Sequence, residues 1–234
     1  MASARYRIGF VTLESLNTYS IQLWLGVNDC TANLDANIIT ISGYQKPHQE
    51  DVNFDDFQKQ IAGMVDLQAL DGILVWTAGI LKNHALAPQF LAQYKAVPTV
   101  SLGVATPGIH SILIDNYQGM FQMVSHLITN CGRREIAFIT GTQTNRDAQI
   151  RLQAYEDALR QHGLPVRAEY IVPGVFAWNS RAVGMQATSK LLDERGLRPD
   201  AIVASSDELA IGALQELHKR GICLPEAISV VGFD

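Results

Sequence analysis

The sequence has few of the features that mark secreted, membrane-spanning or metal-binding proteins. It contains three cysteines, Cys30, Cys131 and Cys223, which are odd in number, widely spaced and distant from the six histidines. This pattern fits neither a disulfide framework nor a zinc site, and we expect Cys30 and Cys223 to be small buried hydrophobic residues. No apolar run approaches the roughly 20 residues of a membrane-spanning helix, and no apolar signal core follows residues 1–7. We therefore expect a cytoplasmic chain with no membrane partner.

Positive charge is also scarce. The 18 lysine and arginine residues are outnumbered by 23 aspartate and glutamate residues, so that the formal net charge is -5. No basic block extends beyond the pair Arg133 and Arg134. A phosphate backbone is bound by clustered basic side chains, so we do not expect this chain to bind DNA by itself.

The usual signatures of α/β enzymes are absent as well. No Gly-x-Gly-x-x-Gly follows the first apolar run, and the sequence has no phosphate loop, nucleophile elbow or His-Glu-x-x-His. We predict that the chain is not an enzyme and that it uses no cofactor or metal. A nucleophile or an acid–base pair in a cleft between lobes would overturn this prediction.

What the sequence does contain is an alternation of short apolar runs with amphipathic helical patterns. Apolar runs at 7–12, 38–42, 72–78 and 98–102 alternate with helical stretches, and the pattern repeats from residue 111. Such continuous runs are typical of parallel strands with helices on both faces of the sheet. Four helical stretches are each followed by a glycine, as a left-handed C-cap favours: Gly132, Gly163, Gly196 and Gly221.

The two repeats predict two lobes. We predict an α/β chain in which residues 6–103 form the N-terminal lobe, 104–110 the crossover and 111–234 the C-terminal lobe, each lobe with a parallel sheet flanked by helices. Open α/β sheets bind ligands at the carboxyl ends of their strands. On topology alone, five residues are candidate ligand contacts of the first lobe: Glu14, Asn17 and Tyr19 in the turn after the first strand, and Trp76 and Thr77 at the end of the third.

Five collinear segments resemble the effector-binding core of the lac/gal repressor family. They are residues 112–116, 132–141, 151–155, 200–214 and 220–234, and the last ends in Val-Val-Gly-Phe-Asp. The resemblance covers nearly the whole chain and implies a type I periplasmic-binding-protein-like fold with a small-molecule effector in the cleft between the lobes. It also implies a homodimer, DNA binding only through a head absent from this chain, and a final return to the first lobe that is missing here.

The resemblance further assigns ligand contacts in the second lobe. It places Arg151 and Asp234 as opposing polar anchors, donating to and accepting from the hydroxyls of a polyol-like effector. Ser206 occupies a position where the family more often has asparagine. A serine hydroxyl can make only part of the hydrogen bonds that an asparagine amide would make to the ligand. Phe176 and Trp178 flank the loop in which the family places an aromatic ring against a sugar face.

Several of these residues also have interpretations without a ligand. Ser205 and Glu208 have capping-box spacing at the start of a helix, and Asp207 is open to interpretation as a cap. Arg151 is open to interpretation as a solvated helical arginine, and its truncation is expected to leave stability nearly unchanged.

The function predicted is that of a sugar-binding or polyol-binding effector domain of a lac-repressor-family transcriptional regulator. Two alternatives stay open: the ligand-sensing input domain of another cytoplasmic signalling protein, and a free solute-binding protein. The absence of a signal sequence counts against the second of these.

Overall fold

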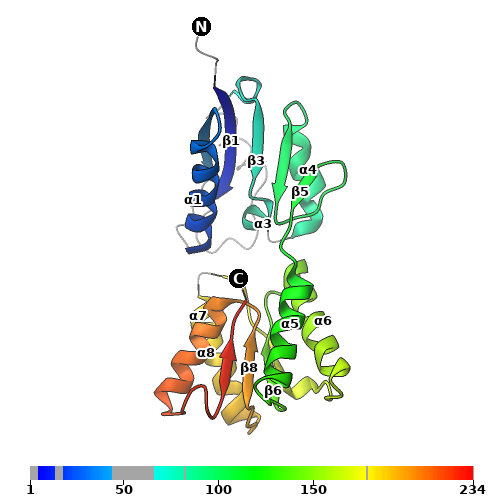
Figure 1. Cartoon of the computed structure of the whole chain (residues 1–234), viewed down its shortest axis with the longest axis vertical. Helices are drawn as coiled ribbons and strands as arrows, with labels where there is room; N and C mark the ends of the chain where they lie inside the picture. Colours follow the sequence, from blue (N-terminus) through cyan, green and yellow to red (C-terminus); the bar gives the residue numbers. More distant parts are fainter. Residues whose placement is uncertain (1–4, 14–17, 44–65, 82, 178, 234) are drawn as a thin grey trace. The chain divides into compact units, whose positions relative to one another are not determined.

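The computed structural model describes residues 5–13, 18–43, 66–81, 83–177 and 179–233, which form two compact units. The division falls between Ile114 and Asp115 (Figure 1). Within this described part of the chain, no helix is both long enough and apolar enough to cross a lipid bilayer.

The first unit is built on a five-stranded parallel sheet in the order β2-β1-β3-β4-β5. The sequence predicts a second lobe from residue 111, whereas β5 pairs with β4 and therefore completes the first sheet. The elements of this unit are β1 (Tyr6–Leu13), α1 (Thr18–Ala32), β2 (Ala36–Gly43), η1 (Leu67–Ala69), β3 (Gly72–Val75), α3 (Thr77–Ile80), η2 (His84–Leu86), α4 (Ala87–Leu91), η3 (Ala92–Tyr94), β4 (Thr99–Leu102) and β5 (His110–Ile112).

The inner strands of the first unit contribute side chains to core clusters on both faces of the sheet. Val11 and Val75 belong to the core cluster that contains Phe90 of α4. Phe10, the neighbour of Val11 in β1, belongs instead to the cluster against which Leu23 of α1 packs. Successive side chains of a strand point to opposite faces. The continuous apolar runs of the sequence are thus accounted for by helices on both sides of the sheet.

The second unit contains a four-stranded parallel sheet in the order β7-β6-β8-β9. Figure 1 shows α7 and α8 on one side of β8, and α5 and α6 on the other. The elements of this unit are α5 (Asn116–Thr129), β6 (Ile136–Ile139), α6 (Arg146–Gln161), η4 (Ala168–Tyr170), β7 (Ile171–Val172), α7 (Ser180–Ser189), the π-helical turn η5 (Lys190–Glu194), β8 (Ala201–Ala204), α8 (Asp207–Lys219) and β9 (Ser229–Val231). The predicted α/β class, with two parallel sheets flanked by helices, is confirmed.

The central strand β6 shows how this unit is packed. Phe138 stacks on Tyr155 of α6, with ring centroids 4.8 Å apart, and the Tyr155 hydroxyl donates to the Ile136 carbonyl at 2.8 Å. Ile139 belongs to the opposite cluster, together with Leu209 of α8. Each face of the sheet therefore has its own helix pair. Because the strands pair in parallel, their carboxyl ends lie at one edge of the sheet.

The glycine prediction at the helix ends is confirmed. Gly132, Gly163, Gly196 and Gly221 have positive φ angles of 69°, 71°, 63° and 69°. A side chain at such φ values is strained, whereas glycine adopts them freely.

The prediction that Cys30 and Cys223 are buried is wrong, because both are exposed, as is Cys131. Leu23 and Val27 of α1 pack towards the core, whereas Cys30 lies on the solvent side of the same helix. Cys223 lies in the loop after α8 rather than inside the helix. The apolar stripe of α1 is thus shorter than the sequence spacing indicates.

The close crossing of α7 and α8 generates the first prediction. A Cβ atom on Gly212 would lie 2.1 Å from the backbone oxygen of Arg181 and 3.0 Å from the Cα of Gly184. Substitution Gly212→Ala must push the helices apart, and we expect it to lower the free energy of unfolding by about 1–3 kcal/mol. Urea unfolding followed by circular dichroism measures this change.

Gly26 of α1 is the matched control, since nothing lies within 4 Å of a Cβ built there. Gly26→Ala should leave stability unchanged or raise it by up to about 1 kcal/mol, because alanine favours the helix. Equal unfolding midpoints for the two variants would show that the α7–α8 contact is looser than described.

Candidate functional site

Polar and aromatic residues of the second unit meet at the carboxyl ends of its parallel strands. Ser205 and Ser206 follow β8, Phe233 follows β9, and Phe176 lies in the loop after β7. Arg151 reaches this edge from the second turn of α6. Because open parallel sheets bind ligands outside the carboxyl ends of their strands, this edge is the candidate site.

Arg151 is the centre of this cluster and is only 5% exposed. Its Nε donates to Oδ1 of Asn116 at 2.7 Å. Its Nη1 donates to the backbone carbonyl of Ser205 at 2.6 Å and to that of Phe233 at 3.4 Å. One side chain therefore joins the start of α5 to the ends of β8 and β9. The interpretation of Arg151 as a solvated helical arginine is wrong.

Two aromatic rings lie within cation–π distance of the same guanidinium. The Arg151 Cζ is 4.3 Å from the ring centroid of Phe233 and 5.6 Å from that of Phe176. Each ring lies against a glycine: a Cβ on Gly119 would be 2.5 Å from the Phe233 ring, and one on Gly141 would be 2.3 Å from the Phe176 ring. A larger residue at either position would displace the ring that faces Arg151.

The loop that carries Phe176 is held by side-chain hydroxyls. The Phe176 backbone N–H donates to Oγ1 of Thr142 at 2.9 Å, and the Gly174 N–H donates to Oγ1 of Thr140 at 3.2 Å. The Ser180 hydroxyl, at the start of α7, donates back to a carbonyl of the same loop at 2.9 Å. These bonds fix the backbone from which the Phe176 ring projects.

Ser206 is the N-cap of α8, and its hydroxyl accepts from the Leu209 N–H at 3.4 Å. The predicted capping box is therefore wrong, because Ser205 is fully buried and its N–H still belongs to the β6–β8 ladder. Glu208 instead pairs with Arg181 of α7, whose Nη2 donates at 3.0 Å. This hydrogen bonding by Arg181 lowers the pKa of the Glu208 carboxyl.

Trp76 and Thr77, predicted as first-lobe contacts, follow β3 and are buried in the first unit. Trp76 belongs to the core cluster that includes Phe10, while the Thr77 hydroxyl donates to the Val75 carbonyl and accepts from Ser101. The ligand roles of all the predicted site residues stay predictions. The residues that lie outside the described part of the chain are Glu14, Asn17, Trp178 and Asp234, together with the side chain of Tyr19.

The sequence does not single out Asn116 or Phe233 as site residues, although both contact Arg151. Both lie inside the segments that carry the family resemblance, at the end of residues 112–116 and within 220–234. Phe233 directly precedes the predicted site residue Asp234 in the sequence, and this adjacency could have indicated Phe233 as a site residue.

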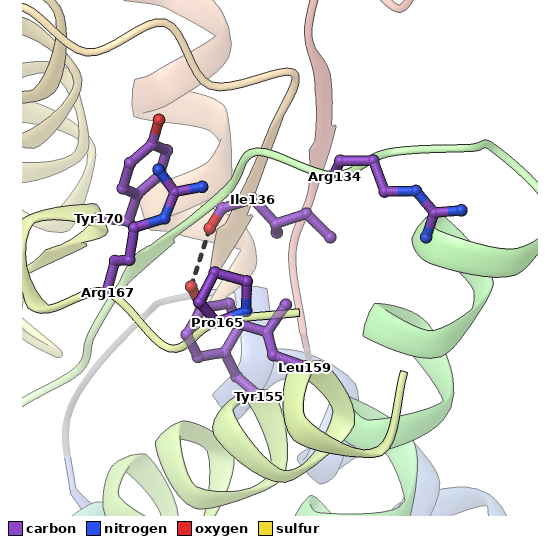
Figure 2. Close-up of a pocket in the computed structure, with 7 residues that line it drawn as sticks. All are labelled: Arg134, Ile136, Tyr155, Leu159, Pro165, Arg167 and Tyr170. Carbon is purple, nitrogen blue, oxygen red and sulfur yellow. Dashed lines mark hydrogen bonds between the residues drawn. The ribbon is translucent and has the colours of Figure 1, made fainter. Parts of the chain in front are cut away.

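Among the described residues, two hollows of different size lie at the amino ends of the strands, away from the candidate site. Figure 2 shows the smaller one, of about 10 Å³, lined by residues that include Arg134, Arg167 and Tyr170. It has room for about one water molecule. The other, of about 230 Å³, lies in the first unit between α1 and the start of β2, and Arg5 and Asn28 are among its lining residues. Its openness to solvent and its place at the amino ends of the strands make it a weaker candidate.

The fold has counterparts among known protein families. The profile of a periplasmic binding protein-like domain matches residues 124–234. Among solved structures, a sugar-binding transcriptional regulator of the LacI family from Escherichia coli, complexed with phosphate, is 30% identical. The match covers 97% of this chain and 78% of that one, with a TM-score of 0.74. A complex of the transcriptional regulator CelR with cellobiose is 26% identical, covering 99% and 69% of the chains with a TM-score of 0.77. These matches define a periplasmic-binding-protein-like domain.

Two curated relatives match different shares of this chain. The HTH-type regulator AscG of Escherichia coli K12 is 43% identical over 125 residues, which are 53% of this chain and 36% of AscG. Catabolite control protein A of Priestia megaterium is 30% identical over 230 residues, which are 97% of this chain and 64% of that protein. Together with the 30% identity to the LacI-family structure, these matches show that the chain belongs to the LacI family, within which it corresponds to the effector-binding domain.

The predicted family resemblance is thus confirmed. The chain spans 36% and 64% of the lengths of these two relatives. AscG is a transcriptional regulator by name, which agrees with the prediction of a non-enzymatic domain.

Because Arg151 is buried, we predict that its truncation destabilises the fold, contrary to the expectation from the sequence that stability would be nearly unchanged. Truncation by Arg151→Ala leaves two backbone carbonyls and the Asn116 amide oxygen without this donor. We expect a loss of about 3 kcal/mol in the free energy of unfolding, in the range for buried hydrogen bonds to a charged group. Urea unfolding measures it.

Arg146, in the first turn of the same helix, is exposed and is the matched control. Arg146→Ala should change stability by no more than about 0.5 kcal/mol. If Arg151→Ala costs no more than Arg146→Ala, then Arg151 does not hold the strand ends together.

Proposed function

We propose that this domain binds a sugar or another polyol-like metabolite at the carboxyl ends of the second unit's strands. Binding there supplies the effector response of a LacI-family regulator of transcription. The observation that carries this proposal is the Arg151 guanidinium, held at that edge by hydrogen bonds and accompanied by the rings of Phe176 and Phe233.

The chemistry of these groups suits a hydroxyl-rich ligand. A guanidinium presents several N–H donors in a fixed planar fork, which matches the closely spaced oxygens of a sugar. An aromatic ring beside it offers an apolar surface to a sugar face. In this proposal Asp234 and Ser206 add further polar contacts, and Trp178 adds a second aromatic surface.

The relatives support this ligand class. One solved relative is described as sugar-binding, and another is in complex with cellobiose. Because the identities to these relatives are only 30% and 26%, we propose the class of ligand and not a particular sugar. Sugars are polyols, and the arginine and aromatic cluster of this domain suits a ligand of that class.

We also propose the partners through which binding is read out. The domain acts as a homodimer, and DNA is contacted by a part of the protein other than this acidic chain of net charge -5. The effector shifts the regulator between states of different DNA affinity. The size of this shift is set by the difference between the effector's affinities for the two states.

Calorimetric titration with cellobiose, glucose and ribose tests the proposal. We expect saturable binding of at least one sugar with one site per chain. Phe176→Leu should weaken that binding by about tenfold, because it removes the aromatic surface while keeping an apolar side chain.

Phe121 is the matched control, since it is a partly buried phenylalanine of α5 that stacks on Tyr117 with ring centroids 6.0 Å apart. Phe121→Leu should leave the affinity unchanged. The proposal fails if none of the sugars binds, or if Phe176→Leu and Phe121→Leu bind the sugar as tightly as the parent chain.

A further inference from the structure

Asn116 is a buried polar residue at a position where its helix does not need one. It is the first residue of α5, and Asp115 already caps this helix by accepting the Gln118 N–H at 3.0 Å. Asparagine is unfavourable within helices, and burying an amide costs free energy unless its hydrogen bonds are made. Asn116 is nevertheless only 5% exposed. The reason for an asparagine here must therefore lie outside the cap of α5.

The Asn116 side chain is hydrogen-bonded to Arg151 of α6. Its Oδ1 accepts from Nε of Arg151 at 2.7 Å, across 35 residues of sequence. The Nη1 of the same guanidinium is held by the carbonyls of Ser205 and Phe233. Because a guanidinium is planar, fixing Nε and Nη1 fixes the orientation of the whole group. Among the residues that the structure describes, Asn116 supplies a side-chain acceptor for this constraint.

We propose that Asn116 is a positioning residue of the effector site, one that orients the Arg151 guanidinium before the effector binds. This inference rests on the proposed function, because it assumes that Arg151 contacts the effector. A side chain that is already oriented has less conformational freedom to lose on binding, which raises affinity without any new contact.

The place of Asn116 in the chain gives this bond a second consequence. The division between the two units falls directly before Asp115, so Asn116 is the second residue of the second unit. A displacement of the start of α5 would move the acceptor of the Arg151 Nε–H. The same hydrogen bond therefore couples the orientation of Arg151 to the segment by which the chain enters the second unit.

Two substitutions separate positioning from a purely structural role. Asn116→Ala removes the acceptor, whereas Asn116→Asp keeps an oxygen at the same place. The first readout needs no ligand: the hydrogen-exchange rate of the Arg151 Nε–H, followed by ¹⁵N NMR and assigned by the loss of its signal in Arg151→Lys. We expect exchange to rise at least about tenfold in Asn116→Ala and to stay near the parent rate in Asn116→Asp.

The second readout is the affinity for the sugar that binds most tightly among cellobiose, glucose and ribose. We expect Asn116→Ala to weaken binding by about three- to tenfold, in line with the ordering of one long side chain, and Asn116→Asp to restore it. A residue that only supports the fold would lower the unfolding midpoint without changing this affinity in the folded protein.

The outcomes distinguish this inference from the proposed function. If no sugar binds the parent chain, the proposed function fails, and the Nε–H exchange still decides whether Asn116 orients Arg151. If Asn116→Ala folds and its Nε–H exchanges as slowly as in the parent, the positioning role is refuted. It is also refuted if the parent binds a sugar and Asn116→Ala binds it equally well.

Discussion

The burial of one guanidinium organises the carboxyl end of the second unit. Removing a charge from water is costly unless its hydrogen bonds are made inside the protein. Within the described part of the chain, its acceptors include the amide oxygen of Asn116 and the backbone carbonyls at the ends of β8 and β9. The faces of Phe176 and Phe233 add favourable electrostatics at 5.6 and 4.3 Å. Elements that are distant in the sequence are thus tied to Arg151. Their mutual positions depend on it.

The same constraint explains smaller features around the site. The rings can lie near Arg151 only because Gly141 and Gly119 leave room beneath them. The Thr142 hydroxyl accepts a hydrogen bond from the backbone N–H of Phe176 and so holds the backbone from which that ring projects. A residue that both supports the fold and faces the proposed ligand couples stability to binding. Any effector that binds the folded state also stabilises it by mass action. Substitutions of Arg151 therefore cannot separate the two effects, whereas those of its neighbours can.

Much of this fold follows from local pattern, but the site does not. Continuous apolar strands and glycines at helix ends predict the α/β class, because both reflect local backbone and burial requirements. Arg151 and Phe176 were found through a family resemblance. Their contacts depend on how α6 and the loop after β7 pack against strand ends that are distant in the sequence. The spacing of residues along the sequence does not reveal such contacts. The sequence predicts Ser205 as the cap of α8, whereas the cap is Ser206, because two adjacent serines between a strand and a helix are equally suited to capping. The sequence also predicts Cys30 as a core residue, which is wrong because α1 carries apolar side chains on its exposed side as well, including Ile21, Trp24 and Leu25.

A crystal structure of the chain with its most tightly bound sugar would test the central claim most directly. The account predicts a sugar hydroxyl within roughly 2.7–3.2 Å of an Arg151 guanidinium nitrogen, with the sugar ring against Phe176. A sugar bound instead in the hollow lined by Arg5, Asn28 and Asn37, with Arg151 untouched, would contradict it.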